Sequence, residues 1–195
     1  MHHHIITPNI SKVLRYPLCS QKVLVAIQNL LKDSLPCRTS IQLPRRLFKF
    51  LQKKDTSWTD ADHPIPFLRS IMAIPARHQP YMDSNLGYAL TKAVHAKFVP
   101  LIQILLENGA NPQCHNSLAV KVAIKQKDLA LLKLLVERTP TRPKAGKKPK
   151  MQDRVKLDPA MLKLAVLSQA KDIVQYMYRE KGVIPDMETL KKIQI

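Results

Sequence analysis

An internal repeat in the C-terminal half constrains the fold of this chain more than any other feature. Three similar segments occupy residues 87–112, 118–138 and 161–182, and they align with an offset of 30 residues and then one of 42. Each segment combines a small residue with pairs of aliphatic residues at helical spacing. The small residues at the matched position are Ala93, Ala123 and Ala165.

Each copy is predicted to form two short antiparallel helices, with the alanine where the helices approach closely. One pair of this kind cannot bury its apolar face alone, so neighbouring copies are expected to stack into a solenoid. No segment shows a convincing run of alternating polar and apolar residues. The predicted fold class is therefore all-α, and a generic helical bundle with accidental periodicity is the alternative.

Prolines divide the rest of the chain into shorter segments. Residues 1–34 are predicted to form an N-terminal helical segment, a degenerate repeat or a cap, whose helix begins after Ser20. Residues 35–84 are predicted to be a proline-rich connector with short helices at 45–53 and 67–73. The repeats are assigned to 85–195, as about 85–117, 118–138 and 159–186, with a basic flexible insert at 139–158.

Positive charge is the second informative feature. The chain of 195 residues has 32 Lys and Arg against 14 Asp and Glu, a net charge of +18 that indicates a partner of opposite charge. The insert has the densest charge and lies among prolines, so it cannot form a packed core by itself. Its basic residues, predicted as an import signal or a phosphate contact with a solvated loop as the alternative, are Arg142, Lys144, Lys147, Lys148, Lys150, Arg154 and Lys156.

The first copy resembles the ankyrin-repeat family. The matched positions are Gly87, Leu90, Ala93, Leu101, Ile102, Leu105, Leu106, Gly109, Ala110 and Asn111. Asn108 and Gly109 are predicted to end the second helix in a C-cap and turn. The chain departs from the family at 89–91, where Ala-Leu-Thr stands in place of Pro-Leu-His, and in an offset shorter than the family's repeat of about 33 residues. We therefore expect trimmed or irregular loops.

The resemblance, which covers about 85–186, implies a short ankyrin-like solenoid that acts as an adaptor or scaffold. Proteins of this family usually bind other proteins through a concave face formed by first helices and loops. The first-helix residues that this implies are Lys92, His95, Lys121, Lys125, Lys163 and Ser168. The loop residues at the rim of that face would be Asn85, Gln113, His115 and Asn116. The alternative for any one of these lysines is that it only keeps the solenoid soluble.

Residues that could carry catalysis are scattered. Cys114 and His115 are neighbours in the sequence without a third group to orient them, and no glycine-rich phosphate loop, HExxH or GxSxG motif occurs. We therefore expect no catalytic residue, no metal ligand, no cofactor and no small-molecule substrate. The leading hypothesis is an adaptor that binds an acidic protein segment. The alternative is an RNA- or DNA-backbone-binding subunit of a ribonucleoprotein or chromatin complex.

Composition gives expectations about the compartment. No apolar stretch approaches the ~20 residues of a membrane helix, so no membrane partner is expected. Three cysteines without a CxxC pair indicate a reducing, intracellular compartment, nuclear or cytoplasmic. No secretory signal is recognised at the start. The bias toward basic residues before Asp33 is shared by mitochondrial presequences and keeps that location as an alternative.

Overall fold

The computed structural model describes residues 12–16, 20, 22–26, 29, 41–52, 57–73, 80–138 and 153–193. These residues are predominantly helical, which confirms the all-α prediction at the level of fold class. They divide into two compact units, an N-terminal unit, Met1–Ala110, and a C-terminal unit, Asn111–Ile195. The division falls inside the segment 85–117 that the sequence assigns to one repeat.

The N-terminal unit begins with short helical segments. Residues 22–26 are helical, and the Ser20 hydroxyl accepts a hydrogen bond from the Val23 N–H at 3.5 Å, as expected for a residue that precedes a helix. The remainder of the predicted N-terminal helix, and Pro36, lie outside the described residues. The two short helices of the connector are α3 (Arg46–Lys49) and α4 (Ile65–Met72).

One small β-element departs from the all-helical expectation. β1 (Ile41–Gln42) and β2 (Pro80–Tyr81) form a two-residue parallel pair in which Ile41 is opposite Pro80. The Leu43 N–H donates to the Ser84 hydroxyl at 3.0 Å next to this pair. The segments are too short for any alternation of side chains to be visible in the sequence.

The first helix pair also belongs to the N-terminal unit. α5 (Ser84–His95) packs against α6 (Val99–Glu107). Asn108 is the C-cap of α6, and Gly109 follows with φ +89°, a value that glycine adopts without steric cost. The predicted C-cap and turn at Asn108-Gly109 are thus confirmed.

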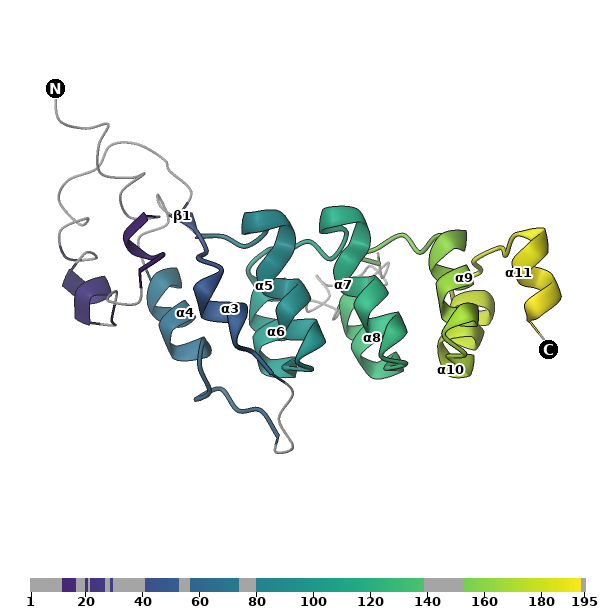
Figure 1. Ribbon diagram of the computed structural model, residues 1–195, viewed down its shortest axis with the longest axis horizontal. Coiled ribbons are helices and arrows are strands. Elements are labelled where there is room, and N and C mark those ends of the chain that lie inside the picture. Colours follow the sequence, from purple (N-terminus) through teal and green to yellow (C-terminus); the bar gives the residue numbers. More distant parts are fainter. Residues whose placement is uncertain are drawn as a thin grey trace, which may run out of the picture. The chain divides into compact units, whose positions relative to one another are not determined.

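The C-terminal unit contains two further helix pairs and one additional helix (Figure 1). α7 (Cys114–Lys125) packs against α8 (Leu129–Val136), and α9 (Pro159–Leu167) packs against α10 (Lys171–Gln175). α10 continues as the π-helical segment η2 (Tyr176–Glu180). The two pairs lie side by side, α7 against α9 and α8 against α10, and α11 (Met187–Lys192) packs on α9.

The turn inside each helix pair recurs with the spacing found in the sequence. Lys97, Lys127 and Gln169 all adopt φ of 54–55°, at offsets of 30 and then 42 residues. In each turn the next residue donates its N–H to the carbonyl of the conserved-position alanine, Ala93, Ala123 or Ala165, five residues before it. This is the hydrogen bond of a Schellman C-cap. The three alanines are 0 % exposed, which confirms their predicted place between helices.

A second backbone feature recurs only in the first two copies. Residues 85–87 and 115–117 each place three successive residues in the left-handed region, at an offset of 30 residues. The Gly87 N–H donates to the Asp83 carbonyl, and the Ser117 N–H donates to the Gln113 carbonyl, both at 3.0 Å. α5 and α7 therefore enter their right-handed turns through a single left-handed turn. α9 instead begins at Asp158, whose carboxylate accepts from the Met161 N–H at 2.7 Å.

Candidate functional site

Three lysines of the first helices gather in the C-terminal unit, and we call them the lysine face: Lys121 and Lys125 of α7, and Lys163 of α9. Lys121 and Lys163 are equivalent residues, since they differ by the 42-residue offset and lie on helices that pack together. Lys125 is exposed one turn after Lys121. Packing of α7 on α9 therefore brings together the lysines of the second and third copies, as the sequence predicts.

Lys163 is already paired within the chain. Its Nζ lies 2.6 Å from a carboxylate oxygen of Glu188 on α11. The hydrogen bond from Lys163 holds the pKa of Glu188 below its ordinary value, and Lys192 adds to this effect. The hydrogen bond with Glu188 in turn raises the pKa of Lys163. Lys121 and Lys125 form no ion pair with a described residue, so these two carry the uncompensated charge of the lysine face.

The remaining residues of the predicted face are distributed more widely. Gln113 is the N-cap of α7, and the exposed His115 and Asn116 form the left-handed turn that follows it. Ser168 is the half-buried C-cap of α9. Lys92 and His95 belong to α5, in the N-terminal unit, so the structure does not place them beside the lysines of α7.

Arg154, from the basic insert, is a structural residue. Its N–H donates to the Val136 carbonyl at 2.6 Å, and its guanidinium donates to the carbonyls of Leu134, at 3.2 Å, and Glu137. These carbonyls belong to the end of α8, where helical carbonyls need outside partners. Arg154 thus closes the base of the insert against α8, which differs from its predicted exposure to phosphate or an import receptor. Lys156 is exposed, and Arg142, Lys144, Lys147, Lys148 and Lys150 lie outside the described residues.

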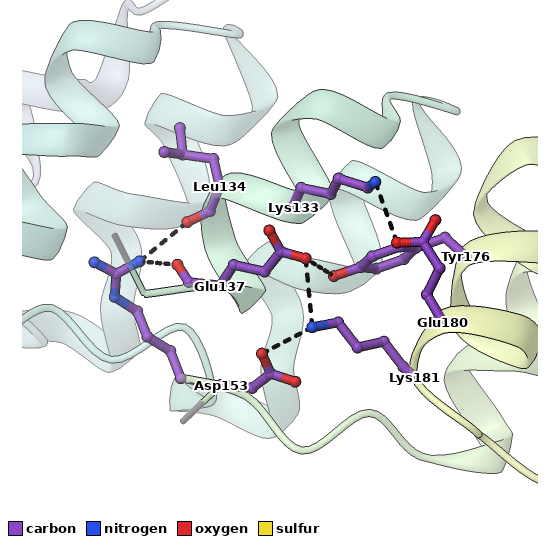
Figure 2. Close-up of polar contacts among 8 residues, drawn as sticks. Lys133, Leu134, Glu137, Asp153, Tyr176, Glu180 and Lys181 are labelled. Atoms are coloured by element: carbon purple, nitrogen blue, oxygen red, sulfur yellow. Dashed lines mark hydrogen bonds and ion pairs between the residues drawn. The ribbon is translucent and has the colours of Figure 1, made fainter. Parts of the chain in front are cut away.

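A polar cluster, which we call the stem network, joins this base to η2 (Figure 2). The buried Tyr176 hydroxyl donates to Glu137 at 2.9 Å. Lys181 lies 3.3 Å from Glu137 and 2.8 Å from Asp153, so one ammonium group joins both ends of the insert. The ammonium groups of Lys133 and Lys181 lie 4.9 and 5.5 Å from the centre of the Tyr176 ring, within the range of cation–π attraction.

The protonation states of the stem network favour these contacts at neutral pH. Burial is the largest cause that raises the pKa of Tyr176, and the hydrogen bond to Glu137 raises it further, so the phenol remains a donor. Burial lowers the pKa of Lys181, but its hydrogen bonds and attraction to Asp153 and Glu137 outweigh this effect. The pKa of Lys181 is consequently raised, and the ammonium group stays charged.

Sequence reasoning did not find the stem network. Its members are separated by up to 44 residues, from Glu137 to Lys181, and they share no motif spacing. The one available signal is the placement of Glu137 and Asp153 as acidic residues that flank an otherwise basic insert.

The described residues offer little support for other chemistry. No three His, Cys, Asp or Glu side chains among them come together as a metal site, and no helix in the described segments has the length and apolar character needed to cross a membrane. Comparisons with protein-family models, with curated proteins and with solved structures produced no match. The function of the chain is therefore inferred from its own residues.

Proposed function

We propose that this chain is a non-enzymatic interaction module, built as a short ankyrin-like solenoid, that binds an acidic protein segment. The support comes from the helix pairs, which recur at the offsets of the sequence repeat and pack side by side in the C-terminal unit. Repeat proteins of this construction present extended surfaces to other macromolecules. An adaptor or scaffold role follows from such a surface without any catalytic group.

The observation that carries the proposal is the pair Lys121 and Lys125 on α7. Both lie on a helix fixed between α8 and α9, and neither has an ion-pair partner among the described residues. Lys163 beside them shows what such a lysine binds in this fold, since it pairs with the Glu188 carboxylate. A partner that supplies carboxylates to Lys121 and Lys125 would extend the same kind of contact.

A charge-reversal experiment tests this proposal. The full chain is titrated into a fluorescein-labelled poly-glutamate peptide, and anisotropy is measured at about 50 and 200 mM salt, a range over which surface charges become screened. Lys121→Glu with Lys125→Glu should weaken binding about tenfold or more relative to Lys12→Glu with Lys22→Glu, which changes two exposed lysines and the net charge equally. Circular dichroism checks that both variants are folded.

Equal weakening in the two charge-matched variants would show only attraction between net charges. That result would remove the lysine face from the proposal. A loss confined to the α7 variant would place the acidic segment on α7.

Nucleic acid remains the second candidate because of the insert. Residues 139–152 contain five basic residues and no acidic one, and the stem network fixes both ends of this segment. Labelled duplex DNA and single-stranded RNA are titrated at the same two salt concentrations. Micromolar or tighter binding that persists at about 200 mM and is lost when Lys144, Lys147, Lys148 and Lys150 become glutamine would favour a phosphate-binding insert. Binding seen at low salt alone would leave a nuclear-import signal as the better proposal for these residues.

A further inference from the structure

A groove at one end of the C-terminal unit has no role in the function proposed above. It has a volume of about 330 Å³ and lies between α9, α10 with η2, and the end of α11. Its apolar part comes from Val166, Val174 and Tyr178, which are all half-buried. We call this site the end groove.

The repeat explains why these apolar residues are there. The residues 42 positions earlier are Ile124, Leu132 and Val136, and each of them is 0 % exposed. α8, which contains two of these residues, packs against α10 of the next copy. The end groove is therefore the surface with which one copy stacks on another, present here in the third copy with its apolar residues only half covered.

α11 defines what kind of element would fit the end groove. Asp186 accepts from the Thr189 N–H at 2.7 Å as Asp158 accepts from the Met161 N–H, so α11 begins like α9, the first helix of a pair. α9 is followed by α10, its second helix, whereas the described residues contain no helix after α11. The element that completes such a pair is a helix with one apolar face.

Charge selects the source of that helix. Lys171 and Arg179 are exposed at the rim, Lys192 lines the opposite side, and no acidic residue lines the groove. A second copy of a chain with net charge +18 would bring more positive charge to this rim. We propose that the end groove binds an amphipathic helix of another protein, with its apolar face on Val174 and Tyr178 and acidic residues toward Lys171 and Arg179.

The test uses a synthetic helix as the probe. The peptide has about 18 residues, with leucines at i, i+4, i+7 and i+11 and glutamates beside them. One leucine is a photoreactive analogue, and a peptide of equal composition with the leucines spread around the helix is the control. Binding to the full chain is measured by anisotropy, and the crosslinked residues are identified by mass spectrometry.

The expected result is crosslinking within 166–193, with binding at least tenfold tighter than that of the control peptide. Val174→Glu should weaken probe binding about tenfold or more. Val99→Glu, which changes an exposed valine of α6 and the net charge equally, should leave it within about twofold. Circular dichroism again verifies folding of both variants.

Three results would overturn the proposal: crosslinks elsewhere, equal effects of the two valine substitutions, or a dimer in analytical ultracentrifugation that Val174→Glu dissociates, since a second copy would then occupy the end groove. The outcome is independent of the lysine face. Lys121→Glu with Lys125→Glu should not move the crosslinks, and Val174→Glu should not change the position of the poly-glutamate contact.

Discussion

Ala123 shows how one small side chain sets the distance between two helices. It is 0 % exposed on α7, and its carbonyl accepts the Asp128 N–H in the turn that leads to α8. A larger side chain at this position would meet the aliphatic residues of α8, such as Leu132, at close range. The same arguments apply to Ala93 and Ala165, their counterparts in the other copies.

Ala123→Glu should lower the free energy of unfolding by several kcal/mol, on the order of 3, because it buries a charge without a partner and overfills the helix contact. Ala130→Glu is the matched control, since Ala130 is exposed on α8, and its effect should stay within about 0.5 kcal/mol. Urea unfolding followed by circular dichroism measures both. An unchanged midpoint for Ala123→Glu would contradict the assignment of the helix contact.

The left-handed turn residues give a prediction of opposite sign. Lys127 has φ +55°, a conformation that costs a non-glycine residue about 1–2 kcal/mol. Lys127→Gly should therefore raise the free energy of unfolding, by up to about 1 kcal/mol after the greater flexibility of unfolded glycine is subtracted. Lys125→Gly, two residues earlier inside α7, should lower it by about 1 kcal/mol.

Thermal unfolding of the two glycine variants measures this difference directly. Destabilisation of similar size in both would contradict the left-handed turn. The sequence could predict where this turn falls, from the repeat offset, but not its conformation. Lys127 and Gln169 carry no preference for positive φ, and the hydrogen bonds to Ala123 and Ala165 impose it.

At the scale of elements, α11 depends on charge for part of its attachment to α9. Hydrogen bonds from Thr189 hold the pKa of Asp186 below its ordinary value, and the hydrogen bond from Lys163 does the same for Glu188. Groups with a lowered pKa in the folded state stabilise it above their ordinary pKa, and this contribution is lost as pH falls through the folded-state value. The stability of the C-terminal unit should consequently decrease on acidification.

Glu188→Gln should make the unfolding midpoint less sensitive to pH between about 5 and 3, because the variant has no carboxylate to protonate at this position. Glu107→Gln is the control, since Glu107 is exposed on α6 and forms no ion pair with a described residue. Urea midpoints are compared across this pH range for both variants and the unaltered chain. An identical slope in all three would show that Glu188 makes no such contribution.

The elements were partly predictable for physical reasons. Periodic apolar residues gave the helix pairs, and α4 begins at Ile65, two residues before the predicted start at Phe67, because Pro66 fits the first turn of a helix. The β1–β2 pair depends on a contact between residues about 40 positions apart, and no local pattern encodes such a pairing. The stem network was hidden for the same reason, since Tyr176 has the pattern of an ordinary core aromatic until Glu137 lies beside it.

At the scale of the whole molecule, charge and architecture are separate kinds of information. A net charge of +18 indicates an acidic partner, but it does not say which lysines are available. The structure assigns Lys163 to Glu188 and Arg154 to α8, and it leaves Lys121 and Lys125 as the uncompensated pair of the lysine face. The sequence could not make this distinction because both assignments depend on contacts between distant segments.

The closed base of the insert has a consequence for how this protein can change. Arg154 and Lys181 fix both ends of the segment 139–152, so α8 and α9 do not depend on its length to hold their places. The entropic cost of a longer connection grows only slowly with the number of residues. The insert is thus a natural position for grafting: a recognition peptide or a tag can replace it while the helix pairs on either side keep their packing.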